Sequence, residues 1–173
     1  MNAVELAAFK ALLAACPPGP RIEFGVFRGA ALRLIADHPG LSIGVDSFAG
    51  MPEPGARDIR DGWNPYPKGR LAAPMRDAAL AAPKARLVQG YVPEVLAAIE
   101  DRGFGFAHLD MDQFGPTLDA LRWTWGRMRP GGVLCCDDWF ADRDWLAAGA
   151  INAFAAELGT LPQTAGRKAW WVI

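Results

Sequence analysis

The stretch RIEFGVFRGAALRLIADHPGLSIGVD, residues 21–46, holds two apolar runs separated by a glycine turn and a helical pattern. Neither apolar run, 21–27 or 41–46, alternates cleanly between apolar and polar residues. Continuous apolar runs of this length are typical of strands that are covered on both faces, as in a parallel sheet. The helical pattern at 29–38 has the right length for the crossover between two such strands. The stretch therefore predicts a β-α-β unit.

The same alternation of strand and helix patterns continues along the chain. Further strand-length apolar runs lie at 85–90, 104–110 and 132–137. Helical patterns lie at 70–83, 93–103, 116–132 and 142–159, the last with Asp142 as its expected cap. The final segment, LPQTAGRKAWWVI, reads as two short strands around a turn. We expect a single domain over residues 1–173 with a Rossmann-like α/β fold, in which a doubly wound, mostly parallel sheet ends in an antiparallel hairpin. This is the pattern of class I methyltransferases.

Two segments stand outside this alternation. The amphipathic segment 1–15 is predicted to form an N-terminal helix that packs on the sheet. The irregular segment 49–69 is long for a loop of a compact domain, and such loops are either functional lids or disordered. Its aromatic residues, Trp63 and Tyr66, favour a lid over a disordered linker.

The bulk composition limits the class of protein. The 18 lysine and arginine residues and 19 aspartate and glutamate residues give a net charge of −1, which argues against a nucleic-acid binder with its usual basic face. No apolar stretch reaches the roughly 18 residues of a membrane span. The N-terminus lacks the basic start of a signal peptide. The three cysteines, of which Cys135 and Cys136 are adjacent, do not suggest a disulfide framework, so we expect a reducing cytoplasm.

The turn after the first predicted strand is rich in glycine. Its motif is E-x-G-x-x-x-G at Glu23, Gly25 and Gly29. Glycines at such a turn let the backbone approach a ligand closely, although packing can also demand them. The second strand ends in Asp46, where an acid can accept hydrogen bonds from both ribose hydroxyls of a nucleoside cofactor. An NAD site would share this acid but prefers the spacing G-x-G-x-x-G, so a cofactor without a pyrophosphate fits better.

Carboxylates also follow two other predicted strands: Asp110 and Asp112 after one, Asp137 and Asp138 after the next. Because ligands of an α/β sheet bind at the carboxyl ends of its strands, adjacent strands would bring these acids together. Clustered carboxylates repel each other unless a proton or a cation joins them, and all-oxygen ligands favour a hard ion such as Mg²⁺. The alternative is that Asp137 and Asp138 cap the following helix while the first pair lies in solvent.

Four segments within residues 21–140 resemble those of a known family: IEFGVFRGAAL, VDSFAGMPEP, LDMDQFGPTLDALRWTWGRMRPGG and VLCCDDWF. In this combination they resemble the macrocin O-methyltransferase family. Its members are S-adenosylmethionine-dependent enzymes that methylate sugar hydroxyls in macrolide antibiotic biosynthesis. One difference is Trp139, because the family commonly has tyrosine after the acid pair.

The resemblance implies roles for individual residues. The cofactor-binding residues would be Glu23, Gly25 and Gly29 at the methionine end, Asp46 with Ser47 and Phe48 at the ribose, and Gln89 and Gly90 beside the adenine. The family's magnesium ion would be bound by Asp110, Asp137 and Asp138. Asp110 would also be catalytic, because it would lie near both the metal and the acceptor hydroxyl.

The expected function is a divalent-metal-assisted transfer of a methyl group from S-adenosylmethionine to a hydroxyl of a small molecule, such as a sugar, polyol or phenol. Two alternatives are an NAD- or nucleotide-sugar-dependent enzyme on a related fold, and a non-catalytic cofactor-binding domain that serves in interactions. His108 lies two residues before Asp110 and is either a base near the metal or a core histidine. Trp170 and Trp171 alternate faces, so one is expected to be buried and the other to be available for a homo-oligomer interface.

Overall fold

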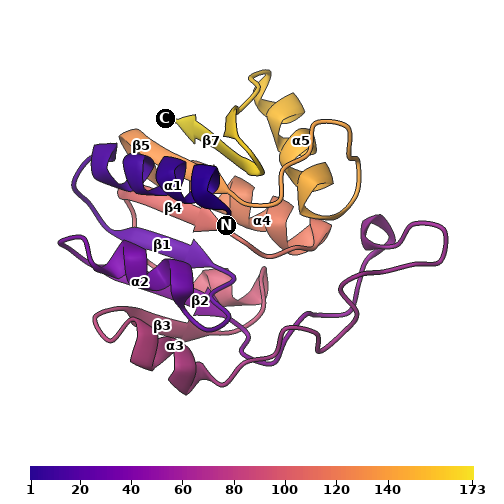
Figure 1. Ribbon diagram of the computed structural model, residues 1–173, viewed down its shortest axis with the longest axis horizontal. Coiled ribbons are helices and arrows are strands. Elements are labelled where there is room, and N and C mark those ends of the chain that lie inside the picture. Colours follow the sequence, from indigo (N-terminus) through magenta and orange to yellow (C-terminus); the bar gives the residue numbers. More distant parts are fainter.

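The computed structural model describes residues 1–173 and is built around one sheet with the strand order β3-β2-β1-β4-β5-β7-β6 (Figure 1). The strands are β1 (Arg21–Phe24), β2 (Ser42–Asp46), β3 (Arg86–Gln89), β4 (Phe104–Leu109), β5 (Met128–Cys136), β6 (Gln163–Ala165) and β7 (Lys168–Val172). The first five run parallel, and β7 runs antiparallel to both β5 and β6. The predicted Rossmann-like methyltransferase fold with its C-terminal antiparallel hairpin is confirmed.

Helices cover both faces of the sheet, as its continuous apolar strands require. One face carries α1 (Ala3–Ala15), α2 (Ala30–Ala36) and α3 (Met75–Ala81), and the other carries the 3₁₀ helix η2 (Glu94–Ala98), α4 (Phe114–Trp125) and α5 (Leu146–Leu158). The helix predicted at 1–15 is confirmed as α1, which begins in a capping box between Asn2 and Glu5. None of these helices is both long and apolar enough to cross a membrane.

The strands direct their side chains into separate cores on the two faces. Ile22 of β1 and Cys136 of β5 belong to the larger core under α4 and α5. Phe106 of β4 and Cys135 of β5 belong to a smaller core, where they pack with Phe9 of α1. The two adjacent cysteines are thus buried, free and directed to opposite faces, as small apolar residues of a doubly covered strand should be.

The five helices predicted after residue 28 are all shorter in the structure, three of them markedly. The pattern at 70–83 becomes α3 only after Pro74, because a residue that precedes proline is disfavoured in the α conformation. The pattern at 93–103 yields only η2, and the chain becomes extended directly after it. The pattern at 116–132 ends as a helix at Trp125, and its last residues begin β5 instead.

Three further expectations concern the ends of elements. Asp142 is not a helix cap, because α5 begins at Leu146 with Trp145 as its N-cap. The first strand ends at Phe24, earlier than the run at 21–27 predicts, because the next residue adopts a left-handed backbone conformation. In the hairpin, Trp171 is buried in the larger core and Trp170 packs half-buried against the smaller one.

The irregular segment 49–69 is the long purple-to-magenta segment at the right of Figure 1. Its only helical piece is the 3₁₀ turn η1 (Ala56–Asp58). The two ends of the segment are tied together, because the N–H of Met51 donates to the carbonyl of Arg70 at 2.8 Å and the N–H of Gly69 donates to the carbonyl of Met51 at 2.9 Å. The segment is therefore a closed loop on a narrow base.

Candidate functional site

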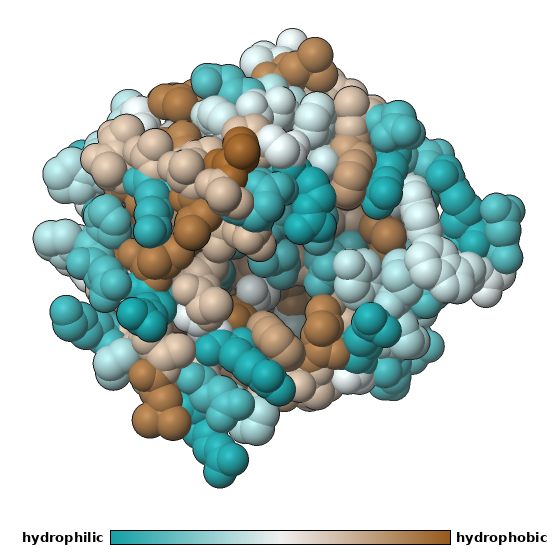
Figure 2. Space-filling model, viewed as in Figure 1, coloured by the Kyte–Doolittle hydropathy of each residue, from teal (hydrophilic) through white to brown (hydrophobic).

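A cavity of about 300 Å³ opens at the carboxyl ends of the parallel strands, where α/β proteins bind their ligands. Its wall includes Gly25 after β1, Asp46 at the end of β2, Gly90 after β3 and Asp110 after β4. Residues of the 49–69 segment close one side of it. Figure 2 shows the surface hollowed between this segment and the strand ends. Four strands thus converge on one ligand-sized space.

Gly25 is the residue that lets the chain turn at the end of β1. Its φ of 83° lies in the left-handed region, and a Cβ atom at this position would lie 1.8 Å from the carbonyl oxygen of Asp110. Any side chain would therefore collide with the backbone that follows β4. Packing demands this glycine, and the same close packing leaves bare backbone in the cavity wall.

The carboxylate of Asp46 is held in place by two backbone donors. Its Oδ2 accepts from the N–H of Phe27 at 2.8 Å, and its Oδ1 accepts from the N–H of Phe48 at 2.7 Å. Both phenylalanines have positive φ angles, 51° and 55°, which turn their N–H groups toward the acid. Each carboxylate oxygen retains acceptor capacity, so Asp46 can still receive hydrogen bonds from two neighbouring hydroxyls of a ligand.

Four of the predicted cofactor-binding residues line the cavity: Gly25, Asp46, Ser47 and Gly90. The other four do not: Glu23, Gly29, Phe48 and Gln89. Glu23 points to the α1 side of the sheet and contacts His108. Gly29 is the N-cap of α2 and packs against α3. Gln89 uses its amide to donate to the carbonyl of Ser47 at 3.1 Å.

Two groups of acidic side chains meet at the ends of β4 and β5. Asp110 belongs to both groups, to one with His108 and Asp137 and to the other with Asp112 and Asp138, and the ligand atoms of each group lie within 4.8 Å of one another. Burial, followed by the charge of Asp137, raises the pKa of Asp110 to about 7. Burial, followed by the charge of Asp110, raises the pKa of Asp112 to about 8. Burial and mutual repulsion therefore favour the protonated forms of these two acids when no cation is bound.

The predicted metal ligands, Asp110, Asp137 and Asp138, do not together form either group. The structure instead places Asp112, at a left-handed φ of 61°, beside Asp110 and Asp138. The alternative that Asp137 and Asp138 cap the following helix while Asp110 and Asp112 lie in solvent is wrong, because the N-cap of α5 is Trp145 and the first pair is partly buried. The four acids thus gather at one place, but in a different combination from the predicted one.

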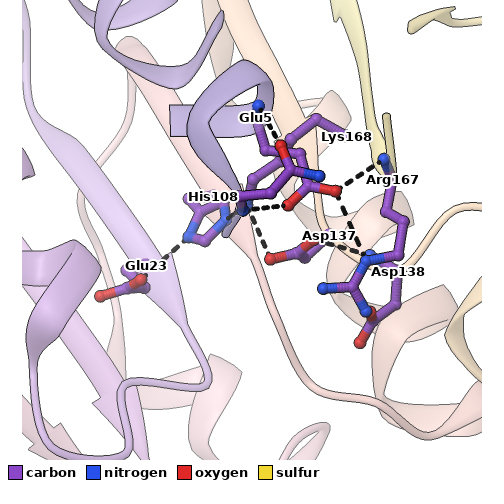
Figure 3. Close-up of polar contacts among 8 residues, drawn as sticks. Glu5, Glu23, His108, Asp137, Asp138, Arg167 and Lys168 are labelled. Carbon is purple, nitrogen blue, oxygen red and sulfur yellow. Dashed lines mark hydrogen bonds and ion pairs between the residues drawn. The ribbon is translucent and has the colours of Figure 1, made fainter. Parts of the chain in front are cut away.

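Cationic side chains of the C-terminal hairpin approach the same acids (Figure 3). Lys168 donates to Asp137 at 2.8 Å, and Arg167 donates to Asp138 at 2.8 Å. The backbone N–H of Arg167 also donates to Glu5 at 3.1 Å, which fixes the first turn of α1 to the hairpin. The sequence reasoning missed these cations, although a lysine at the start of the apolar strand KAWWV is a visible signal.

The group of Asp110, Asp112 and Asp138 fits a hard divalent cation such as Mg²⁺. All of its ligand atoms are carboxylate oxygens, which such ions prefer. Asp110 and Asp112 also line the cavity, so an ion held there would face a ligand in it. A cation would favour the ionised carboxylates and so lower the two raised pKa values.

The 49–69 segment reaches the acids through the half-buried Tyr66. Burial, followed by the charge of the neighbouring Asp112, raises the pKa of the Tyr66 hydroxyl. Gln113, at the start of α4, holds the segment by donating to the carbonyls of Pro52 at 3.3 Å and Tyr66 at 3.1 Å. The segment is in the place that a lid would take, and its opening and closing stay a prediction.

His108 is a fully buried residue of β4. Burial, followed by the charge of Lys168, lowers its pKa well below the usual histidine value. Its side chain contacts Glu23 and Lys168 and is not part of the cavity wall. Of the two interpretations of His108, the core histidine matches this position.

Comparisons with known proteins agree with the fold. The model of a family described as "Methyltransferase domain" matches residues 22–139. The 8-demethyl-8-(2,3-dimethoxy-alpha-L-rhamnosyl)-tetracenomycin-C 4'-O-methyltransferase of Streptomyces olivaceus is 30% identical over 142 residues, which cover 72% of this chain. The aligned part covers 54% of that relative, so this chain spans about half of its length.

Two solved structures share the fold. The O-methyltransferase NovP superposes with a TM-score of 0.80 at 18% sequence identity, over 97% of this chain and 78% of NovP. The O-methyltransferase TomG from Streptomyces achromogenes, solved in complex with S-adenosylmethionine and involved in tomaymycin synthesis, superposes with a TM-score of 0.64 at 16% identity. The latter match covers 98% of this chain and 81% of TomG.

Proposed function

Because this chain belongs to the methyltransferase domain family, we propose that it is an S-adenosylmethionine-dependent O-methyltransferase that acts on a hydroxyl of a small molecule. The observation that carries the proposal is one cavity with two chemically different walls. Asp46 lines one part of the wall, where it would bind the ribose, and Asp110 and Asp112 line another, where either would accept a proton. A cofactor and an acceptor can therefore meet in the same space.

The proposed acceptor is a sugar hydroxyl of a natural product. Its support is the Streptomyces olivaceus relative, whose name describes 4'-O-methylation of a rhamnosyl-tetracenomycin. The motifs that resemble the macrocin O-methyltransferase family point to the same class of acceptor. The cavity is also compatible with a sugar ring, because three carboxylates, Asp46, Asp110 and Asp112, stand in a wall that is otherwise largely apolar.

The residues of the cavity would divide the work of binding and orientation. S-adenosylmethionine supplies an electrophilic methyl group when it is bound. Asp46 would accept hydrogen bonds from the ribose hydroxyls, and the backbone at Gly25, Ser47 and Gly90 would approach the rest of the cofactor. Fixing the cofactor and the acceptor in one geometry is a large part of catalysis for a reaction of this kind.

Asp110 is our proposed proton acceptor for the acceptor hydroxyl. A general base works best when its pKa lies near the operating pH, and the pKa of Asp110 is raised to about 7. Asp112, with a pKa raised to about 8, is the second candidate because it lines the same cavity. The two raised pKa values belong to the protein without a cation. A divalent ion held by these carboxylates would lower them, but as a Lewis acid it would also lower the pKa of the acceptor hydroxyl, so that a weaker base would suffice.

The setting proposed for this activity is a reducing compartment such as the cytoplasm. The support is that Cys16, Cys135 and Cys136 are all free, with the adjacent pair buried in β5.

Ligand binding and methyl transfer test the proposal together. Calorimetry should show that S-adenosylhomocysteine binds and that NAD does not. Mass spectrometry should then detect a gain of one methyl group on rhamnosides or related glycosides incubated with S-adenosylmethionine. Binding of NAD in preference to S-adenosylhomocysteine would overturn the proposed cofactor. Cofactor binding without transfer to any hydroxyl compound would leave a non-catalytic binding domain as the better explanation.

A further inference from the structure

Lys168 is a charged side chain with no exposure to solvent. It is the first residue of β7, and its aliphatic stem lies beneath α1, where the ammonium group is 5.2 Å from the ring centroid of Phe9. A buried ammonium is expensive unless it is paired and hydrogen-bonded. Its partners should therefore explain why the chain keeps a lysine in an otherwise apolar strand.

The ammonium group has two polar partners. Its Nζ lies 2.8 Å from Nε2 of His108 and 2.8 Å from Oδ2 of Asp137. Because the lysine donates to Nε2, the neutral His108 carries its proton on Nδ1 and donates it to Glu23 at 2.9 Å. Figure 3 shows this chain of contacts running from Glu23 through His108 and Lys168 to Asp137.

Both oxygens of Asp137 are engaged by the protein itself. Oδ2 accepts from Lys168, and Oδ1 accepts from the backbone N–H of Asp138 at 2.9 Å. Asp110 and Asp112 have no cationic side chain bonded to them. Two of the clustered acids are paired with cations of the chain: Asp137 with Lys168, which has no exposure to solvent, and Asp138 with Arg167, whose side chain is 46% exposed. An exposed arginine can exchange its contact for water, whereas the buried Lys168 cannot. Asp137 is therefore neutralised from inside the fold, while the two acids that line the cavity are not.

We propose that Lys168 is a resident cation of the carboxylate cluster. It pairs with Asp137 and so withdraws this acid from the divalent-ion site, which is left to Asp110, Asp112 and Asp138. Its positive charge also lowers the affinity of the remaining site for a divalent ion. This inference rests on the proposed metal-assisted function, and it concerns which residues of this chain face the ion.

A double-mutant cycle on ion affinity tests the proposal without an activity assay. Free Mn²⁺ is measured by electron paramagnetic resonance for the wild type, K168M, D137N and K168M/D137N. Methionine keeps the length and apolar character of the lysine stem but removes its charge. K84M, at an exposed lysine, is the matched control and should bind Mn²⁺ as the wild type does.

K168M should bind Mn²⁺ at least about tenfold more tightly than the wild type, because one positive charge near the site is removed. K168M/D137N should return to within about threefold of the wild type, because the pair is neutral and Asp137 is not a ligand. A loss of more than about tenfold in the double variant would identify Asp137 as a ligand and overturn the proposal. Unchanged affinity of K168M, or no binding by either the wild type or K168M, would also overturn it.

Two precautions keep the result decisive. If K168M alone does not fold, because it buries Asp137 without a cation, the Mn²⁺ affinity of K168M/D137N, which buries no unpaired charge, decides by the limits given above. Binding of S-adenosylhomocysteine is measured in parallel by calorimetry. If S-adenosylhomocysteine binds but K168M leaves the Mn²⁺ affinity unchanged, only this inference is overturned. If S-adenosylhomocysteine does not bind, the proposed function is overturned, and the Mn²⁺ measurements still show which acids bind the ion.

Discussion

Asp46 and Asp137 both follow buried strands at the same edge of the sheet, yet the protein holds them in different ways. Asp46 is fixed by backbone N–H groups and lines the cavity. Asp137 is fixed by the ammonium group of Lys168 and is nearly buried. Backbone donors orient a carboxylate without cancelling its charge, whereas a buried ammonium does both. Of these two acids, only Asp46 lines the cavity with both oxygens held by uncharged donors and so remains available to a ligand.

The largest expected effect is on the free energy of unfolding, when the ion pair of Asp137 with Lys168 is broken. Asp137→Ala should lower the free energy of unfolding by about 3–5 kcal/mol, because it leaves Lys168 buried without its carboxylate. Asp46→Ala should cost no more than about 2 kcal/mol, because water can reach the donors it leaves behind. Urea unfolding in the presence of a chelator measures both. Equal losses would mean that Asp137 is no more a structural residue than Asp46 is.

The next largest effect is expected on cofactor binding, when the carboxylate of Asp46 is removed from the cavity. Asp46→Ala should weaken the binding of S-adenosylhomocysteine by roughly 1.5–3 kcal/mol, the usual worth of hydrogen bonds to a charged group. Isothermal titration calorimetry measures the change. Asp37→Ala, at an exposed residue after α2, is the control and should bind as the wild type does. An unaltered affinity of Asp46→Ala would remove this acid from the cofactor site.

A smaller effect is expected for the acids that no cation neutralises. The pKa values of Asp110 and Asp112 rise from 3.8 to about 7 and about 8, so between these limits the folded protein binds more protons than the unfolded chain. The free energy of unfolding of metal-free protein should therefore fall as the pH rises from about 4 to about 8, by at least about 1 kcal/mol. Urea titrations in chelator measure this slope.

Asp112→Asn is the variant that sharpens the pH prediction. It removes one of the two titrating groups, so it should flatten the fall in stability, and Mg²⁺ should do the same for the wild type by favouring the ionised acids. Asp37→Asn should keep the wild-type slope. If the free energy of unfolding of the wild type does not change over this pH range, the pKa values of Asp110 and Asp112 are not raised in the folded protein.

The smallest effect is expected on amide hydrogen exchange in the 49–69 segment. It is anchored at the starts of α4 and α5, where Asp58 accepts from the N–H of Phe114 at 2.6 Å, the Gln113 amide donates to two carbonyls of the segment, and the ring centroid of Trp63 lies 5.8 Å from that of Trp145. Binding of S-adenosylhomocysteine should slow amide hydrogen exchange in residues 53–69 by a few-fold or more, because the segment closes the cavity. Gln113→Ala should raise exchange in the free protein. Equal exchange with and without the cofactor would leave the segment a passive connection.

The order of strands and helices was predictable from the sequence because it depends on local patterns. Continuous apolar runs marked the parallel strands, and the glycine at 25 and the acid at 46 marked two points of the cavity wall. The ends of helices were less predictable. Asp142 has the right residue type for a cap, but the helix starts at Leu146, where the N–H of Ala147 donates to the carbonyl of Asp112 at 2.8 Å, a partner that is distant in the sequence.

The sequence by itself also determined that four acids would gather at one edge of the sheet, because strand ends converge in this class of fold. Only the tertiary structure decided which of them carry uncompensated charge. Lys168 follows Asp137 by 31 residues and reaches it only because the hairpin folds back against β5. Glu23, which was predicted to line the cavity, instead contacts the buried His108 on the neighbouring strand. Local sequence patterns place a carboxylate at the end of a strand. Its electrostatic partner is distant in the sequence, so only the tertiary structure decides which charged residue pairs with it.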